Sequence, residues 1–170
     1  FEALPPLSLY VHVPWCVRKC PYCDFNSHEP RPQTGAGQNG EIPADAFVDA
    51  ALRDLELALP MVWGRPVHTV FFGGGTPSLL PAEAVERLIS GIRARVRLVP
   101  DAEITFEANP GTFEAERFAG FRDAGVNRLS LGVQSFDAVS LQRIGRIHDD
   151  CAARVAAAHA VETFERVNLD

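Results

Sequence analysis

Three cysteines lie within eight positions of one another near the start of the chain. Cys16, Cys20 and Cys23 follow the spacing C-x3-C-x2-C. Thiolates are soft ligands that bind iron–sulfur clusters or zinc. Three sulfurs on one tight loop can hold a four-iron cluster and leave its fourth iron open, as catalytic zinc sites keep one position open for an exchangeable molecule. The neighbouring charges of Arg18 and Lys19 would favour the thiolate forms.

A structural zinc site is the alternative interpretation of these cysteines. Such sites usually combine two closely spaced Cys or Cys/His pairs, and this sequence has no second pair. Cys151 stands alone in a segment of helical pattern, where we expect a small core residue. His12 and His28 flank the loop without a paired spacing. The spacing therefore favours an iron–sulfur cluster over zinc.

Residues capable of binding a ligand also follow the next two apolar segments. Gly73-Gly74-Gly75-Thr76 comes directly after Val67–Phe72, and glycine lets backbone approach a ligand closely, although a simple turn would also use it. Glu107 ends the segment Glu103–Glu107. A carboxylate there is costly to bury unless a hydroxyl or ammonium group partners it, and the alternative is an exposed loop acid.

Two later segments add further candidates. Gln134, which can both donate and accept hydrogen bonds, follows Arg128–Val133. Arg146 could bind a carboxylate with its planar fork, although a surface salt bridge is the alternative. Asp170 stands at the end of Arg166–Asp170. Taken together, these candidates repeat one pattern of apolar segment followed by polar or glycine residues.

Alternating strands and helices would position these residues. The hydrophobic patterns predict strands at Leu7–Val13, Val67–Phe72, Glu103–Glu107, Arg128–Val133 and Arg166–Asp170. They predict helices at Ala44–Leu59, Pro81–Val96, Phe113–Ala124, Ala138–Ile144 and Asp149–Phe164, with Pro60 as a stop and an exposed loop from Glu29 to Pro43. Alternation implies a parallel sheet, either open and doubly wound or part of a barrel, with ligands at the carboxyl ends of its strands.

Composition narrows the class of protein. The chain has 170 residues, 46% of them hydrophobic, which suffices for one domain with a core. A net charge of −6 without a basic stripe argues against nucleic acid as a partner. No apolar run reaches membrane-spanning length and no export signal precedes the first strand, so membrane association is not indicated and we expect a cytoplasmic protein. Because the sequence stops at a strand, we expect a fragment of a longer protein.

The segments LYVHVPWCVRKCPYCDFNSH, FFGGGTPSLL, EITFEANPGT, NRLSLGVQSFD and LQRIGRIHD resemble the radical S-adenosylmethionine (radical SAM) superfamily. Within it they resemble the family related to oxygen-independent coproporphyrinogen III oxidase, and most of all its heme-chaperone branch of the HemW type. The resemblance implies that residues 1–170 form the N-terminal part of a radical SAM core domain, a partial (β/α)6 TIM-like barrel. It implies a [4Fe-4S] cluster on Cys16, Cys20 and Cys23. It implies contacts to S-adenosylmethionine from Tyr10, Tyr22, Gly74, Gly75, Thr76, Glu107, Gln134, Arg146 and Asp170. For Tyr22, packing within the loop is an equal alternative to a place beside the adenine.

One position separates the two branches of that family. The oxidases carry another cysteine two positions after the third cluster cysteine, and this chain has Phe25 there. The resemblance therefore favours a chaperone that binds heme and passes it to acceptor proteins such as respiratory enzymes. The alternative is an oxidase that decarboxylates a porphyrinogen by radical chemistry. The resemblance places heme binding beyond this chain, so no heme ligand and no catalytic residue is assigned.

Overall fold

The computed structural model describes residues 4–30, 42–62, 64–111 and 115–170. Most of the loop predicted between Glu29 and Pro43 lies outside these residues, as do the first two residues of the helix predicted at Phe113–Ala124. The other predicted elements fall within the described chain.

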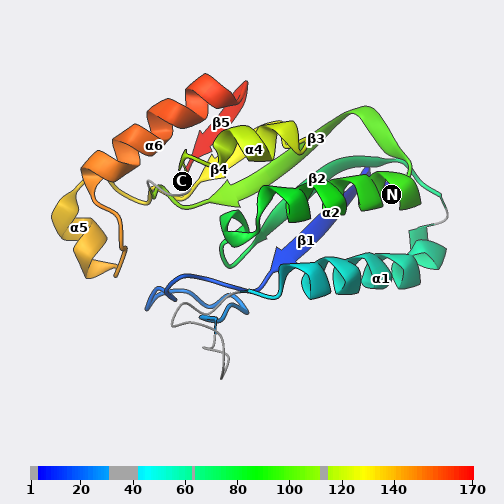
Figure 1. Ribbon diagram of the computed structural model, residues 1–170, viewed down its shortest axis with the longest axis horizontal. Helices are drawn as coiled ribbons and strands as arrows, with labels where there is room; N and C mark the ends of the chain where they lie inside the picture. Colours follow the sequence, from blue (N-terminus) through cyan, green and yellow to red (C-terminus); the bar gives the residue numbers. More distant parts are fainter. Residues whose placement is uncertain (1–3, 31–41, 63, 112–114) are drawn as a thin grey trace.

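A single sheet of five parallel strands forms the centre of the molecule (Figure 1). Its strands are β1 (Leu7–Val13), β2 (Val67–Gly74), β3 (Leu98–Ala108), β4 (Arg128–Leu131) and β5 (Arg166–Leu169). They pair in the order of the sequence, without the reversal that a doubly wound sheet requires. Because right-handed crossovers to successive neighbours put every helix on one face, the order is that of a partial barrel. The predicted α/β class with parallel strands is confirmed.

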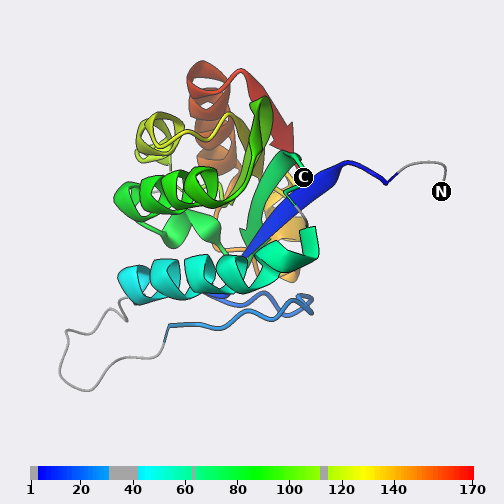
Figure 2. The same cartoon turned by 90° about the vertical axis from the view of Figure 1, so that its right-hand side faces the viewer.

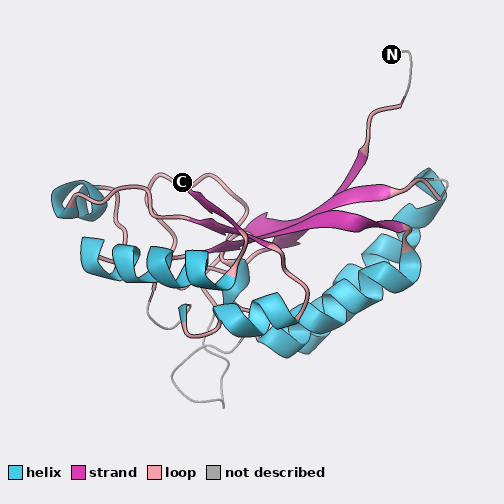
Figure 3. Ribbon diagram, turned by 90° about the horizontal axis from the view of Figure 1, so that it is seen from above, coloured by secondary structure: helices cyan, strands magenta, loops and turns pink. Residues whose placement is uncertain are grey.

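The helices form one layer against this sheet. They are α1 (Ala44–Val62), α2 (Ala82–Arg95), α4 (Phe118–Asp123) and α6 (Asp150–Thr163). The short helix α5 (Ala138–Arg143) lies apart from this layer, beyond the carboxyl ends of the strands, and a 3-10 turn, η1, spans Pro77–Leu79. Figure 3 shows the longer helices on one side of the strands and the opposite face of the sheet uncovered. Among the residues that the structure describes, no helix is both long and apolar enough to cross a lipid bilayer.

The hydrophobic core lies between the sheet and the helices. Because side chains alternate along a strand, Phe72 and Phe106 point to the helical side and are fully buried there. Their ring centroids lie 5.6 Å apart, and Phe106 lies 4.8 Å from Phe121 of α4. The intervening strand residues, such as Thr105 and Glu107, have the opposite parity and lie on the uncovered face. Apolar packing on one face thereby fixes which side chains the other face presents.

Two predicted boundaries are wrong for identifiable reasons. Pro60 does not stop α1, which continues to Val62. A proline removes the hydrogen bond to the carbonyl four residues earlier and crowds that carbonyl, but only two residues of α1 follow Pro60, so little of the helix is affected. β3 begins at Leu98 rather than Glu103, although it contains Pro100. Its pairing with β2 shifts register after the Leu98–Val67 pair, and such irregularities are where a strand tolerates proline.

The carboxyl ends of the strands point in one direction, to the left in Figure 1. The loop after β1 and helix α5 both lie at that side. Figure 2 shows the loop after β1 running alongside α1, where the ring of Trp15 meets the ring of Phe47 edge-on at 5.3 Å. The segments that carry the predicted site residues are therefore gathered at one edge of the sheet.

Candidate functional site

Backbone hydrogen bonds close the base of the cysteine loop, residues 14–28. The amide of Cys16 donates to the carbonyl of His28 at 3.0 Å, and the amide of His28 donates to the carbonyl of Pro14 at 2.7 Å. Further along, the amide of Cys23 donates to the carbonyl of Cys20 at 3.0 Å. These backbone hydrogen bonds hold the three cysteines on one compact loop.

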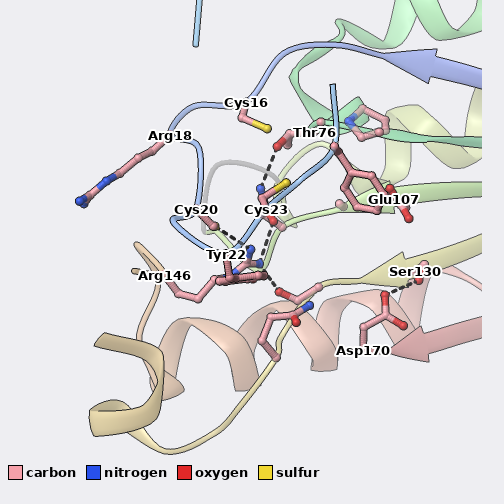
Figure 4. A pocket seen from close by; sticks show the side chains of 18 residues that line it. Cys16, Arg18, Cys20, Tyr22, Cys23, Thr76, Glu107, Ser130, Arg146 and Asp170 are labelled. Atoms are coloured by element: carbon pink, nitrogen blue, oxygen red, sulfur yellow. Dashed lines mark hydrogen bonds between the residues drawn. The ribbon is translucent and has the colours of Figure 1, made fainter. Parts of the chain in front are cut away.

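Two side chains brace the loop from within. The ammonium group of Lys19 donates to the carbonyl of Phe25 at 2.9 Å, so this charge serves the backbone of the loop. Nε2 of His12, on β1, donates to the carbonyl of Asn26 at 2.8 Å. The guanidinium of Arg18 points away from the cysteines (Figure 4). We expected Arg18 and Lys19 to favour the thiolate forms of the cysteines, but neither side chain is directed at a cysteine sulfur in the structure.

The glycine segment after β2 packs directly against the cysteine loop. The amide of Gly75 donates to the carbonyl of Val13 at 2.7 Å, and the amide of Thr76 donates to that of Trp15 at 2.6 Å. Gly74 has φ of +109°, and a Cβ there would fall 2.6 Å from the ring of His12. Only glycine combines this conformation with so close an approach. The glycines are therefore required to bring two strand ends together.

A cavity of about 330 Å³ opens where these segments meet. Figure 4 shows the three cysteines along one side of it, with Glu107, Ser130 and Asp170 across from them. All of the predicted site residues except Tyr10 line the cavity: Cys16, Cys20, Tyr22, Cys23, Gly74, Gly75, Thr76, Glu107, Gln134, Arg146 and Asp170. Residues from five strand ends thus converge on one space, as expected for a barrel.

Tyr10 lies outside the cavity lining, on the uncovered face of the sheet. Its ring stacks on Phe71 at 6.2 Å, and its hydroxyl lies 3.1 Å from Nδ1 of His12. Burial raises the pKa of Tyr10, and the negative charge of Glu107 raises it further. Tyr10 is therefore a neighbour of the site, and its predicted contact with a cofactor stays a prediction.

Glu107 is the most electrostatically unusual group in the cavity. Burial raises the pKa of its carboxyl above the ordinary value, and the nearby charge of Asp170 raises it further, against a hydrogen bond from the amide of Gly74. Asp170 has its own partner, because the hydroxyl of Ser130 donates to its carboxylate at 2.9 Å. Glu107 is thus a half-buried acid that has no ion-pair partner among the described residues.

Arg146 reaches the cavity from the loop after α5. Its guanidinium donates to Oδ1 of Asn109 at 2.9 Å and to the carbonyl of Gly132, and lies 3.6 Å from Sγ of Cys20. The preceding Gly145, with φ of +72°, allows the loop to approach Pro21 closely. Nε of Arg146 is buried and has no hydrogen-bond partner among the described residues. A buried donor without a partner suits a site that receives an acceptor from a ligand.

Two further residues show the effects of the crowded site. Burial raises the pKa of Tyr22, opposed by the charge of Arg146 and reinforced by Cys20. Gln134 has φ of +67°, and its amide donates to the carbonyl of Asp170 at 2.6 Å. A non-glycine residue in the left-handed region is strained, and such strain is concentrated at functional sites.

The donor set has the chemistry of a cluster site, because three thiolate-forming side chains line one cavity. In the described parts of the chain, no three His, Cys, Asp or Glu side chains come close enough together to share one metal ion. Zinc would need all its ligands within about 2.3 Å of one point. A four-iron cluster is larger and binds each thiolate through a different iron, so it accepts sulfurs that are spread around the cavity. Binding of the cluster and of S-adenosylmethionine by these residues stays a prediction.

Sequence reasoning missed two polar residues of the cavity and misjudged a cysteine. Asn109 and Ser130 line the cavity and form hydrogen bonds within it. The alternation of Ser130 with buried Leu129 and Leu131 in β4 was the available signal, since it puts Ser130 on the uncovered face. Cys151 is exposed on α6, so its prediction as a core residue is wrong.

Comparison with known proteins agrees with this geometry. A family model described as the radical SAM superfamily matches residues 10–167. The chain is 55% identical over 91% of its length to the heme chaperone HemW of Escherichia coli, and 46% identical over 98% to that of Haemophilus influenzae. It spans 39% and 43% of those two proteins.

Among solved structures, the fold is similar to coproporphyrinogen III oxidase of Escherichia coli, a radical SAM enzyme. The TM-score is 0.78 at 32% identity, over 96% of this chain and 37% of that one. The shared fold, together with the match over residues 10–167, shows that the chain belongs to the radical SAM superfamily.

Proposed function

We propose that this chain forms the N-terminal part of the radical SAM core of a heme chaperone, a protein that binds heme and transfers it to acceptor proteins. The observation that carries the proposal is the convergence of three cysteines and five strand ends on one cavity. The 55% identity to a bacterial heme chaperone supports the choice among radical SAM functions.

In this proposal Cys16, Cys20 and Cys23 hold a [4Fe-4S] cluster by three irons. S-adenosylmethionine binds beside it, and together the two groups can supply one-electron chemistry when bound. The guanidinium of Arg146 has a planar fork that suits the carboxylate of the cofactor. Glu107 can accept a hydrogen bond from a hydroxyl or ammonium group and so gains the partner that the cavity lacks.

An oxidase that acts on coproporphyrinogen III is the second candidate. The structural similarity to such an enzyme, at a TM-score of 0.78, favours it. Phe25 argues against it, because that branch of the family carries a cysteine at the corresponding position. Phe25 is 59% exposed and lines the cavity. This chain therefore has an apolar ring at the position where the oxidases would have a thiol. We therefore favour the chaperone.

Two measurements on anaerobically reconstituted, full-length protein that contains this chain separate these functions. We expect it to bind heme tightly and to transfer it to an apo acceptor, such as a heme-depleted respiratory enzyme, without consuming coproporphyrinogen III. Formation of protoporphyrinogen from coproporphyrinogen III would refute the chaperone-only function. Absence of both heme binding and decarboxylation would refute both candidates.

We propose that the exchange takes place in the cytoplasm. All four cysteines of the chain are free thiols in the structure, and a reducing compartment keeps them available to a cluster. The net charge of −6 and the absence of a basic stripe in the sequence leave heme and acceptor proteins, rather than nucleic acid, as the partners.

A further inference from the structure

Asn109 follows β3 at the carboxyl end of the sheet, and both ends of its side-chain amide are hydrogen-bonded. Nδ2 donates to the hydroxyl oxygen of Thr76 at 3.1 Å, and Oδ1 accepts from Nη2 of Arg146 at 2.9 Å. A guanidinium can only donate, so the carbonyl of the amide must face Arg146 and its NH₂ group must face Thr76. The chemistry of the two partners thus fixes the orientation of the amide.

These two bonds are part of a longer series of hydrogen bonds that begins and ends in the cysteine loop. The amide of Thr76 donates to the carbonyl of Trp15 at 2.6 Å. At the other end, Nη1 of Arg146 lies 3.6 Å from Sγ of Cys20. Asn109 stands in the middle of this series of hydrogen bonds. It connects the ends of β2 and β3 with the loop after α5.

The position of Asn109 determines what its two partners can offer a ligand. Thr76 is 3% exposed and lines the cavity. Because its oxygen accepts from Asn109, its own hydrogen is not needed for that bond and can be donated to an acceptor in the cavity. Arg146 has a buried Nε without a partner among the described residues. Asn109 therefore orients two donors that suit one carboxylate.

We infer that Asn109 is a positioning residue that orients Thr76 and Arg146 toward the carboxylate of S-adenosylmethionine and, through Arg146, couples that site to the thiolate of Cys20. The inference rests on the proposed cluster and cofactor site. Asn109 itself need not touch the cofactor. A purely structural role, as a brace of the loop after β3, is the alternative.

The test uses Asn109→Leu, which keeps the size of the side chain and removes both hydrogen bonds. Anaerobically reconstituted, reduced protein is titrated with S-adenosylmethionine while the electron paramagnetic resonance spectrum of the cluster is followed. We expect about 10- to 100-fold weaker cofactor binding, the usual cost of losing a residue that orients a ligating group. Iron content should stay unchanged, because all three cysteines remain.

The midpoint potential of the cofactor-free cluster is a second readout. Hydrogen bonds to cluster sulfurs are among the factors that set this potential. Since Asn109→Leu frees Arg146 from its fixed position beside Cys20, we expect a more negative potential. A brace that only stabilises the fold would not shift it. Asn109→Asp keeps the bond to Arg146 but removes the donor to Thr76, and it should also weaken cofactor binding.

The chain offers a matched control in Asn127. Its amide is also bonded at both ends, donating to the carbonyl of Ala102 at 2.9 Å and accepting from the amide of Ile104 at 2.8 Å. These bonds lie at the opposite end of the strands. Asn127→Leu should lower stability while leaving cofactor affinity and cluster potential unchanged. In a double-mutant cycle, Thr76→Val and Asn109→Leu should be less than additive, because both remove the same bond.

Three outcomes decide the inference. Wild-type cofactor affinity in Asn109→Leu or Asn109→Asp would overturn it, and so would an equal loss of affinity in Asn127→Leu. Full additivity with Thr76→Val would also overturn it. A wild-type protein whose cluster does not respond to S-adenosylmethionine would overturn the proposed function as well, so the two failures are distinguishable.

Discussion

The two ends of the uncovered face of the sheet differ in how completely their partly buried polar side chains are paired. At the amino end, Glu103 accepts hydrogen bonds from Thr105 at 3.1 Å, Arg128 at 3.0 Å and Arg166 at 3.3 Å. Burial alone would raise the pKa of Glu103, but the bonds from these residues and the charge of Arg128 outweigh it and lower the pKa. This end of the sheet is electrostatically satisfied.

The carboxyl end is not satisfied in the same way. Burial raises the pKa of Glu107, Nε of Arg146 has no partner among the described residues, and Gln134 adopts a strained backbone conformation. Natural proteins pair nearly all buried polar groups, so the unpaired Nε of Arg146, beside an acid with a raised pKa and a strained residue, points to a place that receives a ligand. The amino end therefore contributes to the architecture, and we propose that the carboxyl end binds a ligand.

The largest effect should come from removing a cluster ligand. We expect Cys20→Ala to abolish the brown absorbance of the cluster, because two thiolates hold it too weakly, while the circular dichroism of the helices is largely kept. Cys151→Ala is the matched control, since Cys151 is exposed on α6 and away from the cavity lining. A full four-iron spectrum in Cys20→Ala would contradict the site.

Glu107→Gln should weaken cofactor binding while the apo protein keeps or gains stability. Loss of a hydrogen bond to a charged group costs about 1.5–3 kcal/mol, or roughly 10- to 100-fold in affinity. The apo protein should gain up to about 1 kcal/mol in free energy of unfolding, because the variant removes the charge of a half-buried carboxylate without a cationic partner. Titration with S-adenosylmethionine and urea unfolding measure the two effects. A stability loss above 1 kcal/mol would mean that Glu107 is architectural.

Glu103→Gln should show the reverse pattern. We expect it to lower the free energy of unfolding by about 1 kcal/mol, because its ion pairs with Arg128 and Arg166 are partly exposed. The affinity for S-adenosylmethionine should stay at the wild-type value. Weaker cofactor binding in this variant would show that the two ends of the sheet are not separate in function.

The smallest expected effect is a difference between Glu107 and Glu103 in how each contributes to stability as pH changes. A raised pKa means that the folded state binds the proton of Glu107 more tightly, so its contribution to stability is present below about pH 4.5 and is lost as pH rises through the folded pKa. The contribution of Glu103 is present above that value and is lost as pH falls through its lowered pKa.

Urea unfolding of the apo variants from neutral to acid pH measures this difference. The stability gain of Glu107→Gln over the wild type should shrink as pH falls, and the stability loss of Glu103→Gln should shrink as well. The two variants therefore approach the wild type from opposite sides. Parallel profiles of the same sign would show that the two acids do not differ in their surroundings.

Much of the fold could be predicted because apolar alternation fixes which strand faces pack. All five strands, and the helices between them, follow from that pattern. The hydrophobic pattern could not decide between a doubly wound sheet and a partial barrel. That choice depends on strand order, which local patterns do not encode. The extension of β3 across Pro100 was hidden for a related reason, since only the register shift against β2 makes the proline acceptable.

The site was predictable where a residue type alone carries the chemistry. The three cysteines and the glycine segment have spacings that few other roles require. Asn109 escaped prediction because its role depends on partners 33 and 37 positions away in sequence. The same limit explains Cys151, whose exposure depends on how α6 turns against the sheet. Contacts between distant segments are the information that a single sequence lacks.

The most direct test of the central claim is Mössbauer spectroscopy of the anaerobically reconstituted, iron-57-labelled protein before and after addition of S-adenosylmethionine. If three thiolates leave one iron for the cofactor, the spectrum should contain a four-iron cluster in which one iron alone changes on addition. Protein that holds no four-iron cluster, or a cluster whose four irons never respond, would contradict the account.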